Sequence, residues 1–231
     1  AGVAVIVDAG INHTTGVGSG AGTAGSTYTG YSYPQYAPAD FHACGSAGND
    51  ILDYKDRSQV QTCELANLAD LNTGNAGVRA TLHAYLQDLL DLGVKGFRID
   101  AAKHIAAEEL AAIFDGLTLT GGGRPYIFQE VIDQDATERI RDNEYTPNGD
   151  VTEFGYSVDL GYYFNAGDLS ALQTITSSLM ASRFAVVFTD NHDNQRGHGA
   201  GGAYILDHRD GNALYNLGNI FMLAYPYGHP S

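Results

Sequence analysis

The fold is constrained most by six short apolar runs that alternate with helical patterns along the chain. The runs lie at residues 3–7, 94–100, 125–130, 151–156, 184–190 and 220–225. Helical patterns lie between them at 78–92, 106–117, 168–180 and 212–218. Because the runs are continuous rather than alternating in polarity, they predict a parallel sheet that helices cover on both faces.

Polar residues stand at or just beyond the ends of four of these runs, namely Asp8, Asp100, Glu130 and Asp193. Two architectures compete, the doubly wound sheet and the (β/α)8 barrel. No glycine-rich phosphate-binding turn follows a run, which weakens the nucleotide-binding alternative. Catalytic groups at the carboxyl ends of several strands are typical of the barrel, which needs eight strands. The sequence therefore predicts a barrel of which two strands are missing.

The run from Gly96 to His104 carries Arg98 two residues before Asp100, and Lys103 follows closely. Charged side chains are rarely buried unless they are paired. Arg98 at the mouth of a sheet therefore suggests that it holds Asp100 ionised, which suits a nucleophile. A purely structural ion pair at a strand end explains the run equally well.

The composition narrows the classes of partner. The chain has 231 residues, 44% of them hydrophobic, which is enough for a sizeable core. Its 12 basic and 27 acidic residues give a formal charge of -15, which argues against nucleic acid or an anionic membrane surface. This balance suits neutral substrates and bound cations, or serves solubility alone. No apolar run approaches the roughly 20 residues of a membrane span.

The two cysteines, Cys44 and Cys63, bracket a stretch rich in Gly, Ser, Asn and Asp. A disulfide in an oxidising compartment and two free thiols in a cytosolic protein both fit this spacing. The chain opens at Ala1 within an apolar run, and we expect it to be a piece of a longer protein.

Four segments gather the polar residues near the strand ends. They are VDAGINH at 7–13, GFRIDAAKH at 96–104, FQEV at 128–131 and FTDNHD at 188–193. In order and spacing they resemble the four conserved regions of the α-amylase family, glycoside hydrolase family 13. Residues 197–202 and 226–228 further resemble the active-site loop and the last strand of animal and actinobacterial members.

The resemblance covers nearly the whole chain and implies an α/β fold, an incomplete (β/α)8 barrel that contains strands three to eight. Residues 1–13 and 76–231 would form the barrel. Residues 14–75 would form a small B domain that is inserted after strand three.

The resemblance also assigns roles to three acids. Asp100 matches the nucleophile, Glu130 the general acid/base, and Asp193 the third carboxylate, which steadies the distorted sugar. A retaining glycosidase needs two carboxyl groups about 5 Å apart, one ionised and one protonated. Arg98 would hold Asp100 ionised, and the apolar residues 126–128 would favour the protonated form of Glu130.

Further positions match the family's substrate and metal contacts. His13 and His192 match histidines that hydrogen-bond sugar hydroxyls, and the expected substrate-binding set is His13, Arg98, Lys103, His104 and His192. The side chains of Asn12 and Asp70 and the carbonyls of Gln61 and His104 match calcium ligands, and Ca2+ favours such oxygen donors. The sequon at 12–14 is then a false positive, because its Asn would bind the metal.

Two other features carry expectations from the resemblance. Cys44 and Cys63 match the B-domain disulfide, which implies a secreted, extracellular protein. Chloride-activated members combine an Arg, an Asn and a later basic residue. Arg98 and Asn191 fill the first two positions, but Ser231 stands at the third. The sequence therefore favours a chloride-independent enzyme.

The implied activity is retaining endo-hydrolysis of α-1,4-glucosidic bonds in starch, glycogen and related α-glucans. Within the same fold, an α-glucosidase or transglycosylase uses the same three acids. A non-catalytic carbohydrate-binding relative is the alternative from another class, although Asp100, Glu130 and Asp193 are all present. A metal-dependent amidohydrolase is disfavoured because no His-x-His pair ends a strand. The expected partner is an α-glucan, with no nucleic acid or membrane, and the complete protein is expected to be a monomer.

Overall fold

The structure is a computed structural model and describes residues 2–16, 18–210 and 213–231. The chain divides into two compact units. The first comprises Ala1–Glu130 and Thr137–Ile140, and the second comprises Val131–Ala136 and Arg141–Ser231. The segment 14–75 lies in the first unit, and its boundaries as an inserted domain remain a prediction.

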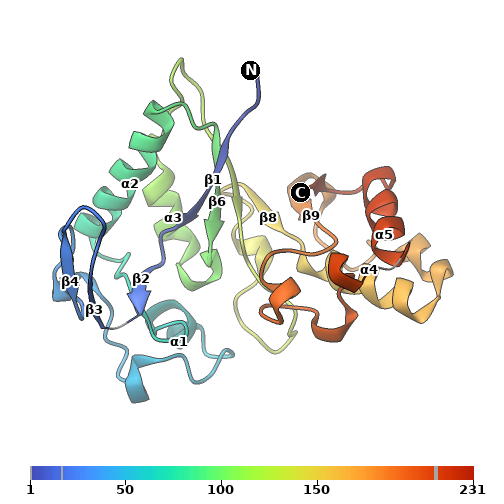
Figure 1. Cartoon of the computed structure of the whole chain (residues 1–231), viewed down its shortest axis with the longest axis horizontal. Helices are drawn as coiled ribbons and strands as arrows, with labels where there is room; N and C mark the ends of the chain where they lie inside the picture. Colours follow the sequence, from blue (N-terminus) through green and yellow to red (C-terminus); the bar gives the residue numbers. More distant parts are fainter. Residues whose placement is uncertain (1, 17, 211–212) are drawn as a thin grey trace. The chain divides into compact units, whose positions relative to one another are not determined.

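A parallel sheet forms the centre of the first unit (Figure 1), from β1 (Ile6–Gly10), β6 (Gly96–Asp100) and β7 (Tyr126–Gln129). Gly10 lies opposite Asp100, and Ile99 lies opposite Gln129. This register brings the carboxyl ends of the three strands to one edge of the sheet, as predicted. β1 begins three residues later than predicted, because pairing starts only where β6 offers a partner at Gly96.

Gly96 shows how closely these strands approach. A Cβ atom at this position would lie 2.4 Å from the carbonyl oxygen of Tyr126. Such a contact is too short for a side chain, so that glycine permits the pairing of β6 with β7 at this point.

Helices α2 (Ala76–Asp91) and α3 (Ala107–Phe114) pack together beside the sheet (Figure 1). The buried residues of α2 recur every four positions, at Val78, Leu82, Leu86 and Leu90. The predicted helix at 78–92 is thereby confirmed. The predicted helix at 106–117 is shorter, because the backbone is extended at Asp115 and left-handed at Gly116.

The long excursion after β1 holds only small elements. Strand β2 (His13–Gly16) pairs antiparallel with β5 (Leu68–Asp70), and β3 (Ser19–Ala21) pairs with β4 (Thr27–Thr29). The excursion also contains α1 (Arg57–Thr62). A disulfide joins Cys44 to Cys63, which confirms the predicted pairing.

The second unit has its own parallel strands, β8 (Asp150–Thr152), β9 (Ala185–Val187) and β10 (His229–Pro230). Helices α4 (Phe154–Ala166) and α5 (Ala213–Ala224) complete it. Its core includes Tyr156, Leu160 and Phe164 of α4 and Met222 of α5, packed around Val187. The described residues thus contain six parallel strands, three in each unit.

Four elements of the second unit differ from the prediction, and one of them is the strand at 184–190, which is shortened to Ala185–Val187. The predicted strand at 151–156 ends at Thr152, because a helix begins two residues later with the side chain of Glu153 as its cap. The predicted helix at 168–180 is only a 3-10 segment, Leu169–Thr174, because Thr and Ser occupy most positions from 174 to 178. The apolar run at 220–225 belongs to α5 rather than to a strand. Residue 212, the expected start of that helix, lies outside the described residues.

Short 3-10 turns connect these elements, at Pro38–Asp40, Ala47–Asn49, Ala102–His104, Asp142–Glu144, Ser182–Phe184, Asn194–Arg196, Gly202–Tyr204 and His208–Asp210. Among the helices within the described ranges, none combines the length and apolar character that crossing a membrane demands.

Candidate active site

Arg98 is the centre of the charged cluster at the carboxyl edge of the first unit's sheet. Its Nη1 lies 2.5 Å from Oδ1 of Asp8 and 2.8 Å from Oδ1 of Asp100. Its Nη2 lies 2.7 Å from Oε1 of Glu130. Burial alone would lower the pKa of Arg98, but Glu130, Asp8 and Asp100 together raise it above its usual value. One guanidinium thus links carboxylates from all three strands.

Glu130 directly follows β7 and is buried. Its Oε1 meets Arg98, and its Oε2 accepts a hydrogen bond of 3.0 Å from the backbone N–H of Ala101. Both contacts favour the ionised carboxylate. The oxygens of Glu130 thus contact polar groups, and the protonated state expected for an acid catalyst stays a prediction.

Ala101 adopts a left-handed conformation with φ of 50° immediately after Asp100. This conformation is uncommon for residues other than Gly, Asn and Asp, and such strain concentrates at functional sites. Here it aims a backbone N–H at Glu130. Sequence reasoning missed Ala101, because alanine carries no signal for this conformation.

Two neutral histidines lie near Asp100. Burial lowers the pKa of His13, and the charge of Asp100 opposes this effect. Burial lowers the pKa of His104 to about 4, while its Nδ1 donates to the carbonyl of Val60 at 3.0 Å. The ring of His104 therefore anchors α1, in addition to the predicted substrate contact.

Lys103 is buried, and its ammonium group forms an ion pair with Glu138. Its backbone N–H also donates to the carbonyl of Glu130. Lys103 was predicted to contact the substrate. Its side chain is already paired with a carboxylate, and the substrate contact stays a prediction. Glu138 lay outside the predicted site, because it belongs to no strand-end pattern.

The predicted residues Asn191, His192 and Asp193 lie in a turn of the second unit. Oδ1 of Asn191 accepts hydrogen bonds from the N–H groups of Asp193 and Asn194, at 3.0 and 2.8 Å. Nε2 of His192 lies 3.4 Å from Oδ2 of Asp193. The turn leaves the side chain of Asp193 40% exposed, open to a ligand. Asn191 thus serves its own turn, and the expected chloride role of Asn191 and Arg98 stays a prediction.

The predicted calcium ligands with side-chain donors lie together in the first unit. Asn12 and Asp70 are buried, and Nδ2 of Asn12 donates to Oδ1 of Asp70 at 3.1 Å. Oδ1 of Asn12 has no hydrogen-bond partner among the described residues. A buried carboxylate beside a buried orphan carbonyl oxygen fits a calcium ion. Gln61 lies in α1, which the ring of His104 joins through Val60.

One unpredicted group in the second unit also has metal-ligand chemistry. Single ligand atoms of Asp190, Asp207 and His208 lie within 4.8 Å of one another. Arg209, however, already binds both carboxylate oxygens of Asp207, through Nε at 3.0 and 2.8 Å. Arg209 thereby offsets the charge of Asp207, one of the two carboxylates in this group.

A cavity of about 630 Å³ opens in the second unit beside the start of α4. Asp133, Asp142, Asp159 and Arg141 line it, and the buried Glu153 contributes to its wall. Burial raises the pKa of Glu153 to about 7, although its oxygens accept from the N–H groups of Gly155 and Met180. No pattern in the sequence singles out these residues.

Parallel strands with acidic residues at their carboxyl ends place the chain in the class of α/β-barrel proteins. No family model matches the sequence. The chain is 48% identical to an α-amylase of Thermomonospora curvata over 238 residues, covering 100% of this chain and 37% of that protein. It is 42% identical to the pancreatic α-amylase of Sus scrofa, covering 98% of this chain and 48% of that protein.

Solved structures agree with these relatives. The chain matches α-amylase I of Eisenia fetida with a TM-score of 0.94 and 39% identity, covering 99% of this chain and 50% of that one. A glutamate-to-glutamine variant of that enzyme in complex with maltohexaose matches equally well, at 38% identity. The chain is thus similar over nearly its whole length to α-amylases, and it spans about half the length of the animal relatives it matches. The predicted fold, an incomplete (β/α)8 barrel, is confirmed.

Proposed function

We propose that this chain forms the catalytic part of a retaining, endo-acting α-amylase that hydrolyses α-1,4-glucosidic bonds in starch and glycogen. The observation that carries the proposal is the contact of Arg98 with both Asp100 and Glu130, from neighbouring strands. A retaining glycosidase needs two such carboxyl groups close together. The names of the relatives point the same way.

The two carboxyl groups divide the work. Asp100 attacks the anomeric carbon of the sugar and forms a glycosyl-enzyme, while Glu130 protonates the departing glycosidic oxygen. Water then cleaves the glycosyl-enzyme, and Glu130 takes up its proton. Because Arg98 and the N–H of Ala101 favour the ionised Glu130, substrate binding must loosen these contacts before Glu130 can act as an acid.

Other residues bind the substrate in this proposal. Burial keeps both rings neutral, so that half-buried His13 offers one ring N–H donor and one acceptor to sugar hydroxyls. The N–H of His104 is already bonded to the carbonyl of Val60, so its ring offers Nε2 as an acceptor. His192 and Asp193 act from the turn of the second unit, where Asp193 steadies the distorted sugar. The maltohexaose bound to the Eisenia fetida variant supports a chain of glucose units as ligand. An α-glucosidase or a transglycosylase would use the same acids and is distinguished by its products.

Activity measurements on variants test this proposal. The protein is expressed from its whole gene, together with any segments that flank these residues. Glu130→Gln and Asp100→Asn should each lower kcat on soluble starch by at least about 1,000-fold. Glu109→Gln, which removes a carboxylate that binds Thr73, is the matched control and should retain activity. Early release of oligosaccharides of mixed length indicates endo-action. Retention of most activity by Glu130→Gln contradicts the assignment.

We further propose that the protein binds Ca2+ and is secreted. Asn12 and Asp70 would hold the ion with the carbonyls of Gln61 and His104, and the ion would join these segments without taking part in bond cleavage. The disulfide between Cys44 and Cys63 supports an oxidising, extracellular location. EDTA should lower the Tm of the protein, and added Ca2+ should restore it. An unchanged Tm in excess EDTA contradicts the calcium site.

A further inference from the structure

Glu64 is a fully buried carboxylate for which neither the proposed reaction nor the expected calcium ligands have a use. Its Oε1 accepts hydrogen bonds from the hydroxyl of Tyr31 at 2.7 Å and from Nδ2 of Asn49 at 3.2 Å. Its Oε2 has no hydrogen-bond partner within the described part of the chain. A buried carboxylate oxygen without a partner needs an explanation.

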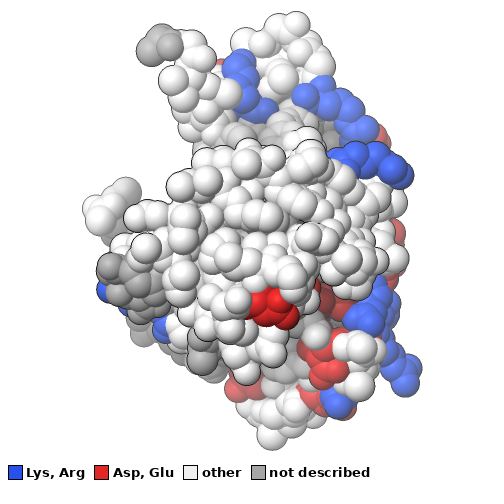
Figure 2. Space-filling view, turned by 90° about the vertical axis from the view of Figure 1, so that its right-hand side faces the viewer, with Lys and Arg blue, Asp and Glu red and all other residues white. Residues whose placement is uncertain are grey.

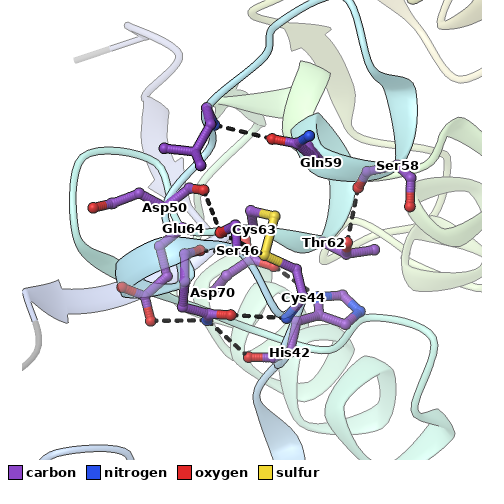
Figure 3. Close-up of a disulfide and its surroundings, with 12 residues drawn as sticks. His42, Cys44, Ser46, Asp50, Ser58, Gln59, Thr62, Cys63, Glu64 and Asp70 are labelled. Atoms are coloured by element: carbon purple, nitrogen blue, oxygen red, sulfur yellow. Dashed lines mark hydrogen bonds and ion pairs between the residues drawn. A yellow bond between two sulfur atoms is a disulfide. The ribbon is translucent and has the colours of Figure 1, made fainter.

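Glu64 is linked to Asp70 through a short network around the disulfide (Figure 3). Nδ2 of Asn49 donates both to Glu64 and to the carbonyl of His42, the second at 3.1 Å. The ring of His42 lies 2.6 Å from Oδ2 of Asp70.

The charges in this region do not balance. Glu64 and Asp70 are both almost completely shielded from water, with exposed fractions of 0% and 1%. The ring of His42 contacts Asp70, whereas the side-chain partners of Glu64 given above, Tyr31 and Asn49, are neutral. Burying a carboxylate without compensation is costly, and buried charges are paired or coordinate metals. The two orphan oxygens, Oε2 of Glu64 and Oδ1 of Asn12, are of the type that Ca2+ prefers.

We propose that Glu64 supplies a second buried negative charge to the calcium site of Asn12 and Asp70, and so strengthens Ca2+ binding. The inference rests on the calcium site proposed above. Glu64 acts through its charge, because the hydrogen bonds at its Oε1 are available to a neutral amide oxygen as well. It follows Cys63 directly, so that the disulfide helps to hold it in place.

Isothermal titration of the calcium-free protein with Ca2+ tests this. Glu64→Gln retains the shape and the acceptor and removes only the charge, and it should raise the Kd for Ca2+ about 10- to 100-fold. Tyr31→Phe removes a hydrogen bond from Oε1 but keeps the charge, so its Kd should stay near that of the parent. Asp88→Asn removes the same charge from an exposed position of α2 and should also bind like the parent.

The outcomes separate this inference from the calcium site itself. Failure of the parent to bind Ca2+ overturns both. A parent that binds Ca2+, together with a Glu64→Gln variant of unchanged Kd, overturns only the role of Glu64. If Glu64→Gln does not fold, Glu64→Asp keeps the charge and should bind more tightly than Asp70→Asn. A loss as large as that of Asp70→Asn would mean that shape matters at position 64, and would also overturn the proposal.

Discussion

Single residues show both what the sequence predicts and where prediction stops. The ion pair of Arg98 with Asp100 could be predicted because both residues stand in one strand. The partners Asp8 and Glu130 were visible as polar strand ends, but not as contacts of Arg98. Asp8 is 90 positions away in the chain, and its contact depends on the register that places Gly10 opposite Asp100. That register follows from packing of whole strands, which no local pattern records.

Replacing Arg98 tests the importance of this shared contact. Arg98→Lys keeps the positive charge but cannot direct separate N–H groups at three carboxylates. We expect kcat on starch to fall by about 100-fold, with a changed pH profile, because Asp100 and Glu130 lose their common partner. Arg79→Lys is the matched control, because the guanidinium of Arg79 donates to the backbone carbonyls of Thr73 and Gly74 and lies outside the proposed site. A variant with parental kcat and pH profile would show that the clamp is structural.

At the scale of elements, the outcome of the predictions differs from one pattern to the next. The apolar runs at 94–100 and 125–130 contain strands as predicted, whereas the predicted strands at 151–156 and 220–225 and the predicted helix at 168–180 are wrong or much shorter. The spacing of α2 is unambiguous over sixteen residues. In contrast, the run 151–156 was predicted as a strand, yet β8 spans only 150–152 and pairs with β9 at Val151 and Thr152. The structure ends the strand there because Glu153 caps α4 and because Tyr156, Leu160 and Phe164 are buried at helical spacing. A short apolar run cannot distinguish these alternatives by itself.

The cap of α4 makes stability depend on pH. The pKa of Glu153 is raised from its usual value of 4.5 to about 7 in the folded protein. Between pH 4.5 and pH 7, Glu153 is therefore protonated in the folded protein but ionised in the unfolded chain. Stability therefore falls as pH rises through this window, by about 1–3 kcal/mol. Glu153→Gln should flatten this decline when Tm is measured from pH 4.5 to 7.5. The exposed Glu108→Gln serves as the control, and an identical slope in all three proteins contradicts the expectation.

The disulfide is the covalent brace of the long excursion. It closes a loop with a sequence separation of 19 residues, and it links segments that contain little regular structure. Constraining a loop of this length contributes about 3 kcal/mol. The double variant Cys44→Ala/Cys63→Ala should therefore melt several degrees lower, with a weaker Ca2+ affinity because Glu64 is less well held. A reductant should reproduce the shift in the parent and have no effect on the double variant.

On the scale of the whole molecule, the net charge of -15 is not spread evenly. The face in Figure 2 consists mostly of uncharged residues. Its acidic groups lie mainly in the lower half, and most of its basic groups lie toward the right side, with others at the top and the lower left. A neutral polysaccharide would therefore not be repelled from such a surface. Composition alone predicted the absence of a polyanionic partner but not this distribution, which the fold determines.

The edges of the strands lead to a prediction for these 231 residues expressed alone. Within the described sheet, β1 pairs only with β6. In the segment that precedes β1, Val3 is 82% exposed and Val5 is 55% exposed. Helix α5 likewise exposes Ile220 and Leu223. Unpaired edges with exposed apolar side chains favour association between chains. We therefore expect the isolated chain to be insoluble or aggregated, and inactive on starch.

Expression of the isolated chain with a matched edge variant tests this expectation. Val5→Lys places a charge at the edge and keeps the backbone bond from the N–H of Lys95 to the carbonyl of residue 5. It should raise the soluble fraction measured by size-exclusion chromatography, because a charged edge resists pairing with another chain. Ala136→Lys adds the same charge at an exposed position outside the strands and should not raise the soluble fraction. A monodisperse, starch-cleaving parent chain would mean that the six strands suffice for a stable fold.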